Sequence, residues 1–356
     1  MIRKFLALTL LPGALLATSV RADNPGDTNL SGLMFIDFTD VNTQKNGTNV
    51  DPDGYGLDVK RFYFGVNHSF DETWSATFIT DFNLPKLTVT GKDSTGTTVT
   101  STGTAPETQI FVKKAYLQGH FDDAATLRIG SADMPWILYV ESFYGYRFVE
   151  NTLVDRLKFG NTADWGLHLA GHNGANSANY AVSLVNGGGF RNPSRSKGMD
   201  VEGRIGFLPV DGLAITVGAY SGKLGQDTDA TPARHTASRE DFLLAWKAAG
   251  LTVGGEYFSA DNFTTVTSTA TDKASGYSLF GSYDLPQGYS VFARYDRAKT
   301  SKDLDPSLED TYYNAGVAWK SSPNIIWALA YKSDKLADSV TELKTREFGV
   351  WAQVKF

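Results

Sequence analysis

The sequence predicts an all-β protein, a single transmembrane β-barrel of sixteen antiparallel strands with short periplasmic turns and long external loops. Three observations predict this fold. Short segments alternate between apolar and polar residues, the links between them alternate in length, and the N-terminus has the features of an export signal. The chain also contains 22 Phe, 16 Tyr and 7 Trp but no Cys, which excludes a disulfide framework and a thiolate metal site.

The N-terminal residues 1–22 have the three parts of a signal peptide. Arg3 and Lys4 are basic, residues 5–20 are mostly apolar, and Ala22 ends a short segment suited to cleavage. A membrane anchor is the alternative, but Pro12 interrupts an apolar run that is already short. We therefore expect an exported protein whose pore domain covers residues 23–356.

The predicted strands share a period of two residues, which places alternate side chains on opposite faces. In the last segment every second residue from Phe348 to Phe356 is apolar. Phe280 and Phe292 interrupt this pattern in their own segments. The sixteen segments cover about residues 28–39, 56–69, 73–83, 108–121, 124–131, 164–172, 178–186, 198–207, 213–220, 240–247, 251–259, 275–285, 289–298, 310–320, 325–333 and 345–356.

The links between these segments alternate in length, as in outer-membrane barrels with short periplasmic turns and long external loops. A soluble β-sandwich, the alternative fold, has no reason to alternate in this way. Because the first link is long and therefore external, the alternation places both termini in the periplasm. The expected long links are 40–55, 84–107, 132–163, 187–197, 221–239, 260–274, 299–309 and 334–344, and the short links include 70–72, 122–123, 173–177, 208–212, 248–250 and 286–288.

A membrane-spanning sheet must close, because hydrocarbon offers no hydrogen-bond partner to an open edge. The outward face must then be apolar, with aromatic residues at the two interfaces. A barrel of sixteen strands is too wide for side chains to fill, so its interior should hold water. The polar inward residues of the predicted strands fit this expectation.

The sequence between residues 128 and 190 resembles one known family. It contains R-I-G-S-A-D-M-P-W, then A-D-W-G-L-H-L-A-G-H, then N-Y-A-V-S-L-V-N-G-G-G. These motifs resemble those of the phosphate-selective porin O and P family, with similarity over about 60–190. The resemblance implies a sixteen-stranded trimeric channel with a loop folded into the barrel. It does not imply phosphate selectivity, because this chain departs from the dominant basic ladder of the phosphate-specific members.

Catalytic and metal-binding patterns are weak, so we expect no enzyme, no cofactor and no metal site. His168 and His172 share one face of a predicted strand, but they lie about two pleats apart, too far for ideal shared coordination. Residues 187–189 are three glycines without the helix and Lys of a phosphate-binding loop. The net charge of -6 argues against nucleic acid as a partner.

The predicted lumen carries balanced charge. Strict alternation places nine basic and nine acidic residues on the inward face, an arrangement that orients polar solutes without strong selection by sign. The basic residues are Arg61, Lys114, Arg128, Arg204, Lys247, Arg294, Lys320, Lys332 and Lys355, and the acidic residues are Asp37, Asp81, Asp200, Glu202, Asp241, Glu256, Asp284, Asp296 and Glu347.

The loop 132–150 is unusually aromatic and would expose too much apolar surface in open water. We expect it to fold into the barrel and narrow the pore, with its rings packed on the wall. A stacking track for sugars is the alternative role of the rings. The candidate constriction residues are Trp136, Tyr139, Glu141, Tyr144, Tyr146 and Arg147 in the loop, with Arg61, Arg128 and Arg204 on the opposing wall.

These features predict an outer-membrane porin, a water-filled channel for passive diffusion of small hydrophilic solutes or ions. The alternatives are a channel that prefers phosphate, other anions or sugars, or a plugged structural or adhesive barrel. The expected partners are two further copies in a homotrimer, outer-membrane lipids and lipopolysaccharide, and the outer-membrane assembly machinery. Phe356 resembles the terminal residue that this machinery recognises.

Overall fold

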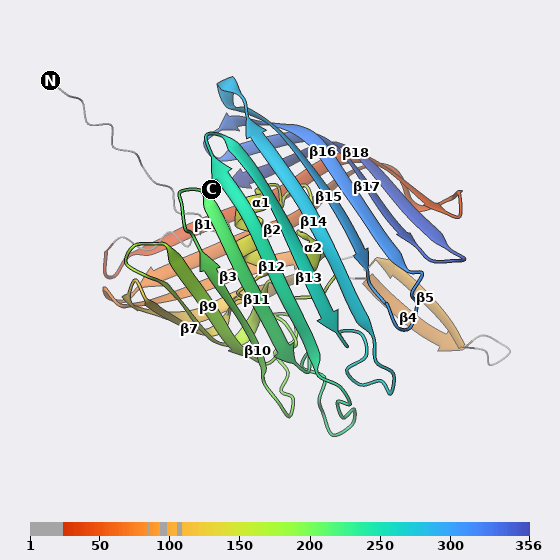
Figure 1. The fold of residues 1–356 in the computed structure, drawn as a ribbon, viewed down its shortest axis with the longest axis horizontal. Helices are drawn as coiled ribbons and strands as arrows, with labels where there is room; N and C mark the ends of the chain where they lie inside the picture. The colour runs from red at the N-terminus through yellow and green to blue at the C-terminus, as the bar shows by residue number, and fades with distance from the viewer. Residues whose placement is uncertain (1–23, 84–85, 93–97, 105–108) are drawn as a thin grey trace.

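The computed structural model describes residues 24–83, 86–92, 98–104 and 109–356, so the predicted signal peptide lies outside the described residues. Sixteen strands form one closed antiparallel barrel (Figure 1), which confirms the predicted fold class. They are β1 (Thr28–Lys45), β2 (Thr48–Ser69), β3 (Trp74–Asn83), β6 (Gln109–Asp122), β7 (Ala125–Asp133), β8 (Ala163–His172), β9 (Ala178–Val185), β10 (Asp200–Phe207), β11 (Leu213–Gly222), β12 (Ala237–Ala248), β13 (Leu251–Asp261), β14 (Lys273–Asp284), β15 (Tyr289–Lys299), β16 (Glu309–Ser322), β17 (Ile325–Ala337) and β18 (Glu342–Lys355).

The remaining elements are short. β4 (Lys86–Lys92) and β5 (Thr98–Thr104) form a separate hairpin that projects from the wall (Figure 1). The helices are α1 (Ile137–Tyr144), α2 (Leu153–Arg156) and the 3₁₀ turn η1 (Pro286–Gly288). Within the described residues, no helix is long and apolar enough to cross a membrane.

The seam between β1 and β18 closes the barrel. Phe35 lies opposite Gln353 of β18 on one side and Arg61 of β2 on the other. The terminal residue Phe356 extends the seam, since its N–H donates to the Gly32 carbonyl at 3.0 Å and its carbonyl accepts from the Gly32 N–H at 2.6 Å. The first and last strands therefore leave no open edge of the kind that hydrocarbon excludes.

The prediction of long external loops at 40–55 and 334–344 is wrong, because the neighbouring strands extend into both ranges. Residues 40–55 continue β1 and β2 to a two-residue turn at Asn46 and Gly47, whose φ angles of 50° and 80° suit the tight hairpin turn that Asn-Gly favours. Residues 334–344 reduce to a turn around Asp338, which accepts from the N–H groups of Val340 and Thr341 at 2.6 and 2.8 Å. These polar strands extend beyond the membrane, where no apolar face is needed to mark them.

The outward face carries aromatic rows at two heights. Tyr295 lies opposite Tyr313 in one row, and Tyr289 lies opposite Trp319 in the other, with Trp319 stacked on Trp327 at 6.5 Å. Tyr289 and Tyr295 are separated by roughly 20 Å along β15, at about 3.4 Å per residue. Because the strands of such barrels tilt by about 35–45°, the two rows are separated by roughly 15 Å along the membrane normal, which lies within the apolar band of about 25 Å.

We predict that Gly349→Val weakens the barrel seam. A Cβ atom at Gly349 would lie 2.3 Å from the Phe38 carbonyl oxygen and 2.6 Å from the Thr39 Cα of β1, so the strands would have to separate. The expected cost is about 1–3 kcal/mol. The change should lower the temperature at which the folded band converts to the unfolded band in a detergent gel.

Gly56→Val is the matched control, because no atom lies within 4 Å of a Cβ built at Gly56. Equal conversion temperatures for the two variants would contradict the proposed close approach at the seam.

Candidate functional site

The chain enters the barrel directly after β7. The segment 134–162, which contains α1 and α2, lies inside the ring of strands, and its helices contact β12, β13 and β14 (Figure 1). We call residues 134–162 the inner segment. α1 ends at Gly145, which takes the left-handed conformation (φ 79°) and donates its N–H to the Glu141 carbonyl at 3.0 Å. A glycine suits this position because it has no Cβ to clash.

Trp136 anchors the start of the inner segment. Its backbone N–H donates to Glu202 of β10 at 2.9 Å, and its indole N–H donates to Glu256 of β13 at 2.8 Å. The side chain is fully buried. Gly218 of β11 makes room for the ring, since a Cβ there would lie 2.6 Å from it. Two carboxylates and a small residue of three different strands thus fix the backbone and the ring of Trp136.

Arg204 and Tyr139 extend this anchor. The Arg204 Nε donates to the Pro135 carbonyl at 2.9 Å, and its guanidinium carbon lies 3.7 Å from the Tyr139 ring centroid. Thr216 donates to the Tyr139 hydroxyl at 3.3 Å. Arg204 therefore does not lie on an opposing wall, as expected from the sequence, because it lies beneath the inner segment and holds it.

Apolar rings on the inward face receive the aromatic residues of the inner segment. Tyr144 contacts Phe280 with ring centroids 5.8 Å apart, and Tyr146 stacks on Phe292 at 4.0 Å. The Tyr146 hydroxyl also donates to Ser290 at 2.9 Å. Phe280 and Phe292 are the residues that interrupt the strand alternation, and their contacts explain why apolar side chains occupy inward positions.

Glu141 and Arg147 differ from the expectation that they face the solute path. The Arg147 Nε lies 2.6 Å from the Glu141 Oε1, and both side chains are buried. Arg147 also donates to the Tyr63 hydroxyl of β2 at 3.3 and 3.4 Å. Burial raises the pKa of Glu141 to about 7, although Arg147 opposes this shift. The two charges pair with each other because neither reaches enough water.

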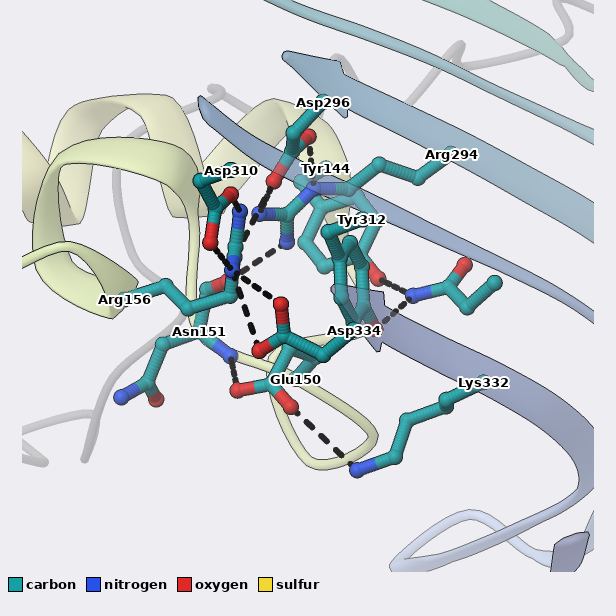
Figure 2. Close-up of polar contacts among 11 residues, drawn as sticks. Tyr144, Glu150, Asn151, Arg156, Arg294, Asp296, Asp310, Tyr312, Lys332 and Asp334 are labelled. Atoms are coloured by element: carbon teal, nitrogen blue, oxygen red, sulfur yellow. Dashed lines mark hydrogen bonds and ion pairs between the residues drawn. The ribbon is translucent and has the colours of Figure 1, made fainter. Parts of the chain in front are cut away.

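A cluster of ionised side chains anchors α2 (Figure 2). Arg156 contacts Asp296 of β15 at 3.3 Å, Asp310 of β16 at 2.5 Å and Asp334 of β17 at 3.2 Å. Arg294 donates a second set of hydrogen bonds to Asp296, at 2.8 Å from its Nε. One guanidinium therefore joins α2 to three adjacent strands.

The end of this cluster reaches Lys332 of β17. Its ammonium lies 3.2 Å from Glu150 of the inner segment (Figure 2). It also lies 2.6 Å from Glu347 of β18. It also donates to the Val149 carbonyl at 3.3 Å. The segment between α1 and α2 is thus held to the same wall as α2.

The two remaining wall candidates lie outside this cluster. Arg61 contacts Asp81 of β3 at 3.1 Å, and Arg128 donates to Gln118 at 2.8 Å with Asp133 4.0 Å away. The side chains of Arg61 and Arg128 are 23% and 29% exposed, so both reach lumen water.

Sequence reasoning missed three residues of the site. Arg156 lies in an irregular segment, where no periodicity assigns direction. Arg239 contacts Glu202 at 3.0 Å and Asp241 at 2.9 Å, but it precedes the predicted start of its strand at residue 240. Lys113 lies at a register shift between β3 and β6, so Lys113 and Lys114 are both buried instead of alternating. The direction of a side chain at a strand start or at a bulge therefore cannot be predicted from the alternation of residues.

A closed sixteen-stranded barrel with a wide polar interior and a loop held inside it defines the class of outer-membrane porins. The family model of the phosphate-selective porins O and P matches residues 29–238, and the chain belongs to that family. It is an outer-membrane channel for passive diffusion of small hydrophilic solutes or ions.

Solved structures share the fold at low sequence identity. An anion-selective porin from Comamonas acidovorans has a TM-score of 0.61 at 11% identity, covering 93% of this chain and 100% of its own. OmpF of Salmonella typhi, in complex with daunomycin, has the same score and identity over 96% of this chain and 100% of its own. The outer-membrane channel DcaP of Acinetobacter baumannii has a TM-score of 0.61 at 11% identity, covering 94% of this chain and 99% of its own. No curated protein sequence matches the chain.

We predict that Arg156→Gln releases α2 from the wall. The change leaves Asp296, Asp310 and Asp334 without their shared cation, and removing one partner of a buried ion pair costs about 3–5 kcal/mol. Urea titration in detergent should report a lower free energy of unfolding, and single-channel recordings should show additional current fluctuation.

The control is Arg297→Gln, which removes an exposed pair with Glu309 on the outer face. Exposed pairs contribute little, so this variant should behave as the wild type. Single-channel recordings of Arg156→Gln without additional current fluctuation would exclude a role of the cluster in holding the inner segment.

Proposed function

We propose that the inner segment sets the size limit of the channel and that the remaining passage favours anions. The observation that carries this proposal is the pair of cations Lys113 and Arg191, which have no carboxylate within ion-pair distance in the described part of the chain. The main function remains passive diffusion, with a preference by charge rather than a specific phosphate site.

The contacts of the inner segment with opposite walls support a role as the constriction. At one side Arg147 reaches Tyr63 of β2, and the Phe148 ring lies 6.4 Å from Phe35 of β1. At the other side Trp136 binds Glu256 of β13 and Glu202 of β10. A segment that joins both walls leaves solutes a passage along β3, β6, β7, β8 and β9.

The basic residues of this remaining wall support the preference for anions. Arg61 and Lys114 each pair with one carboxylate, Asp81 and Asp133 respectively. Arg128 lies at the 4.0 Å limit of the same Asp133. Together with Asp164 of β8, these residues give three positive and three negative side chains, so the excess of positive charge on this wall comes from Lys113 and Arg191.

Aromatic rings, and for Lys113 also the Tyr63 hydroxyl at 3.0 Å, contact Lys113 and Arg191 in place of carboxylates. The Lys113 ammonium lies 4.9 Å from the Phe190 ring, and the Arg191 guanidinium lies 4.3 Å from the Phe111 ring. The two rings stack on each other at 5.8 Å. Rings attract a cation through their negative faces without neutralising it. Arg191 is exposed to the passage, whereas the buried Lys113 acts on passing anions only through its field.

Several acidic residues of the opposite wall have cationic partners. Arg239 contacts Glu202 and Asp241, and Arg156 contacts Asp310. Glu256 and Asp200 instead accept hydrogen bonds from neutral donors. The balanced count of inward charges that the sequence predicts thus separates into a partly neutralised acidic side and a basic side with two cations that lack carboxylate partners among the described residues. Anions moving along the basic side meet an attractive field.

We predict that the double change Lys113→Gln and Arg191→Gln shifts the permeability ratio toward cations. The change removes both unpaired positive charges, while Gln keeps a side chain of similar length. Reversal potentials across a potassium chloride gradient measure the ratio. Lys335→Gln, outside the passage and close to Glu342 at 3.7 Å, is the control. An unchanged reversal potential in the double variant would remove the basis for the proposed anion preference.

We predict that replacing residues 137–147 by a short Gly-Ser link raises single-channel conductance and admits larger sugars, because it removes α1 and its rings from the lumen. Conductance and liposome swelling with sugars of increasing size measure both effects. Unchanged size exclusion would place the constriction elsewhere, and a wild-type barrel without conductance would favour the plugged structural role.

We also propose that the channel is a homotrimer, that residues 1–22 are removed on export, and that Phe356 is read by the assembly machinery. The neighbours named above as porins, the seam position of Phe356 and the projecting β4–β5 hairpin support these proposals. Detergent-corrected light scattering should give three times the chain mass. A monomeric mass at working concentrations would contradict the trimer.

A further inference from the structure

A hollow of about 250 Å³ opens beside the inner segment, at the external side of α2. It lies between residues 158–161, the link that follows β9 and the link that follows β11. The lining residues that matter here are Met134, Lys158, Asn161, Tyr220, Gln226 and Phe263. None of them belongs to the constriction candidates or to the proposed basic wall.

The floor of the hollow is apolar and aromatic. The rings of Tyr220 and Phe263 lie 5.5 Å apart at 46°, and Met134 is buried beside them. Backbone of Gly187 and Gly188 lines one side without side chains. Two tilted aromatic rings of this kind offer apolar contacts to the apolar face of a ring-shaped solute.

The rim carries neutral hydrogen-bonding groups. The side-chain amides of Asn161 and Gln226 line the hollow, and neither makes a hydrogen bond to any other described residue. A carboxamide offers two N–H donors and a carbonyl acceptor. Two unengaged amides at one opening therefore supply both kinds of partner that a hydroxyl group requires.

The ionised groups at the hollow already have partners. Asp164 accepts from the N–H groups of Gly187 and Gly189 at 3.1 and 3.0 Å. Glu202 is paired with Arg239 at 3.0 Å, and Lys158 donates to the Asp155 carbonyl at 2.9 Å. These engagements favour a neutral ligand over a metal cation or a small anion.

We propose that this hollow binds a neutral, polyhydroxylated solute of the size of one sugar ring. The hydroxyl groups bond to Asn161 and Gln226, and the ring lies on Tyr220 and Phe263. The volume is slightly below the range of about 300–1,000 Å³ for sites of drug-sized ligands, which suits a single ring better than an oligosaccharide. The proposal requires an open lumen but not the preference for anions.

The test is calorimetric titration of the detergent-solubilised full-length protein with glucose. The wild type should bind glucose saturably, and Asn161→Ala and Gln226→Ala should each weaken binding by about fivefold to tenfold, the effect of one lost hydrogen bond. Asn324→Ala, in an exposed turn at the other end of the barrel, is the matched control. Heat-dependent gel mobility establishes that each variant is folded.

Absence of glucose binding by the wild type would overturn the proposal, as would equal affinity of the two variants and the wild type. Binding of acetate that displaces glucose and is lost in Lys158→Gln would also overturn it, as would binding of calcium that displaces glucose. Reversal potentials of Asn161→Ala should equal those of the wild type, so failure of the sugar site and failure of the anion preference give different results.

Discussion

Every backbone N–H and C=O group in the hydrocarbon must find a partner within the sheet, and the rest of the structure depends on this constraint. It forces β1 to pair with β18 and makes the barrel close. With sixteen strands the closed interior is too wide for side chains to fill. The inner segment occupies part of that space, so the requirement for closure also creates the need for a separate element that defines the passage.

The inner segment is irregular, and buried charge rather than backbone pairing holds it. Arg156, Arg239 and Lys332 each contact at least two carboxylates. Burying an ion pair gains little by itself, but losing one partner is costly. The clusters therefore act mainly through specificity, because a displaced segment would leave several charges without partners at once. The ring contacts of the inner segment with Phe280 and Phe292 add the apolar packing that the ion pairs do not supply.

The sequence predicted the strands, their number and the inward segment, because alternation and loop length are local consequences of the membrane. It could not predict which side chains pair across the lumen. Glu141 and Arg147 were predicted to face the solute path. In the folded barrel they pair with each other beside Tyr63, a contact that the sequence pattern does not indicate. Lys113 was absent from the predicted inward charges, because a register shift in the ladder leaves no trace in the residue pattern. The Asn46-Gly47 turn carried a local signal that the polar composition of 40–55 obscured.

The position of the partners of the inner segment has a consequence for the order of folding. Arg156 binds Asp334, which lies 178 residues later in the chain. The wall residues that receive α2 belong to β15, β16 and β17, so the inner segment has no complete docking surface until nearly the whole barrel exists. The passage therefore takes its final width last, after closure. The inner segment also cannot be exchanged between related barrels as an independent unit, because part of its binding surface is encoded near the C-terminus.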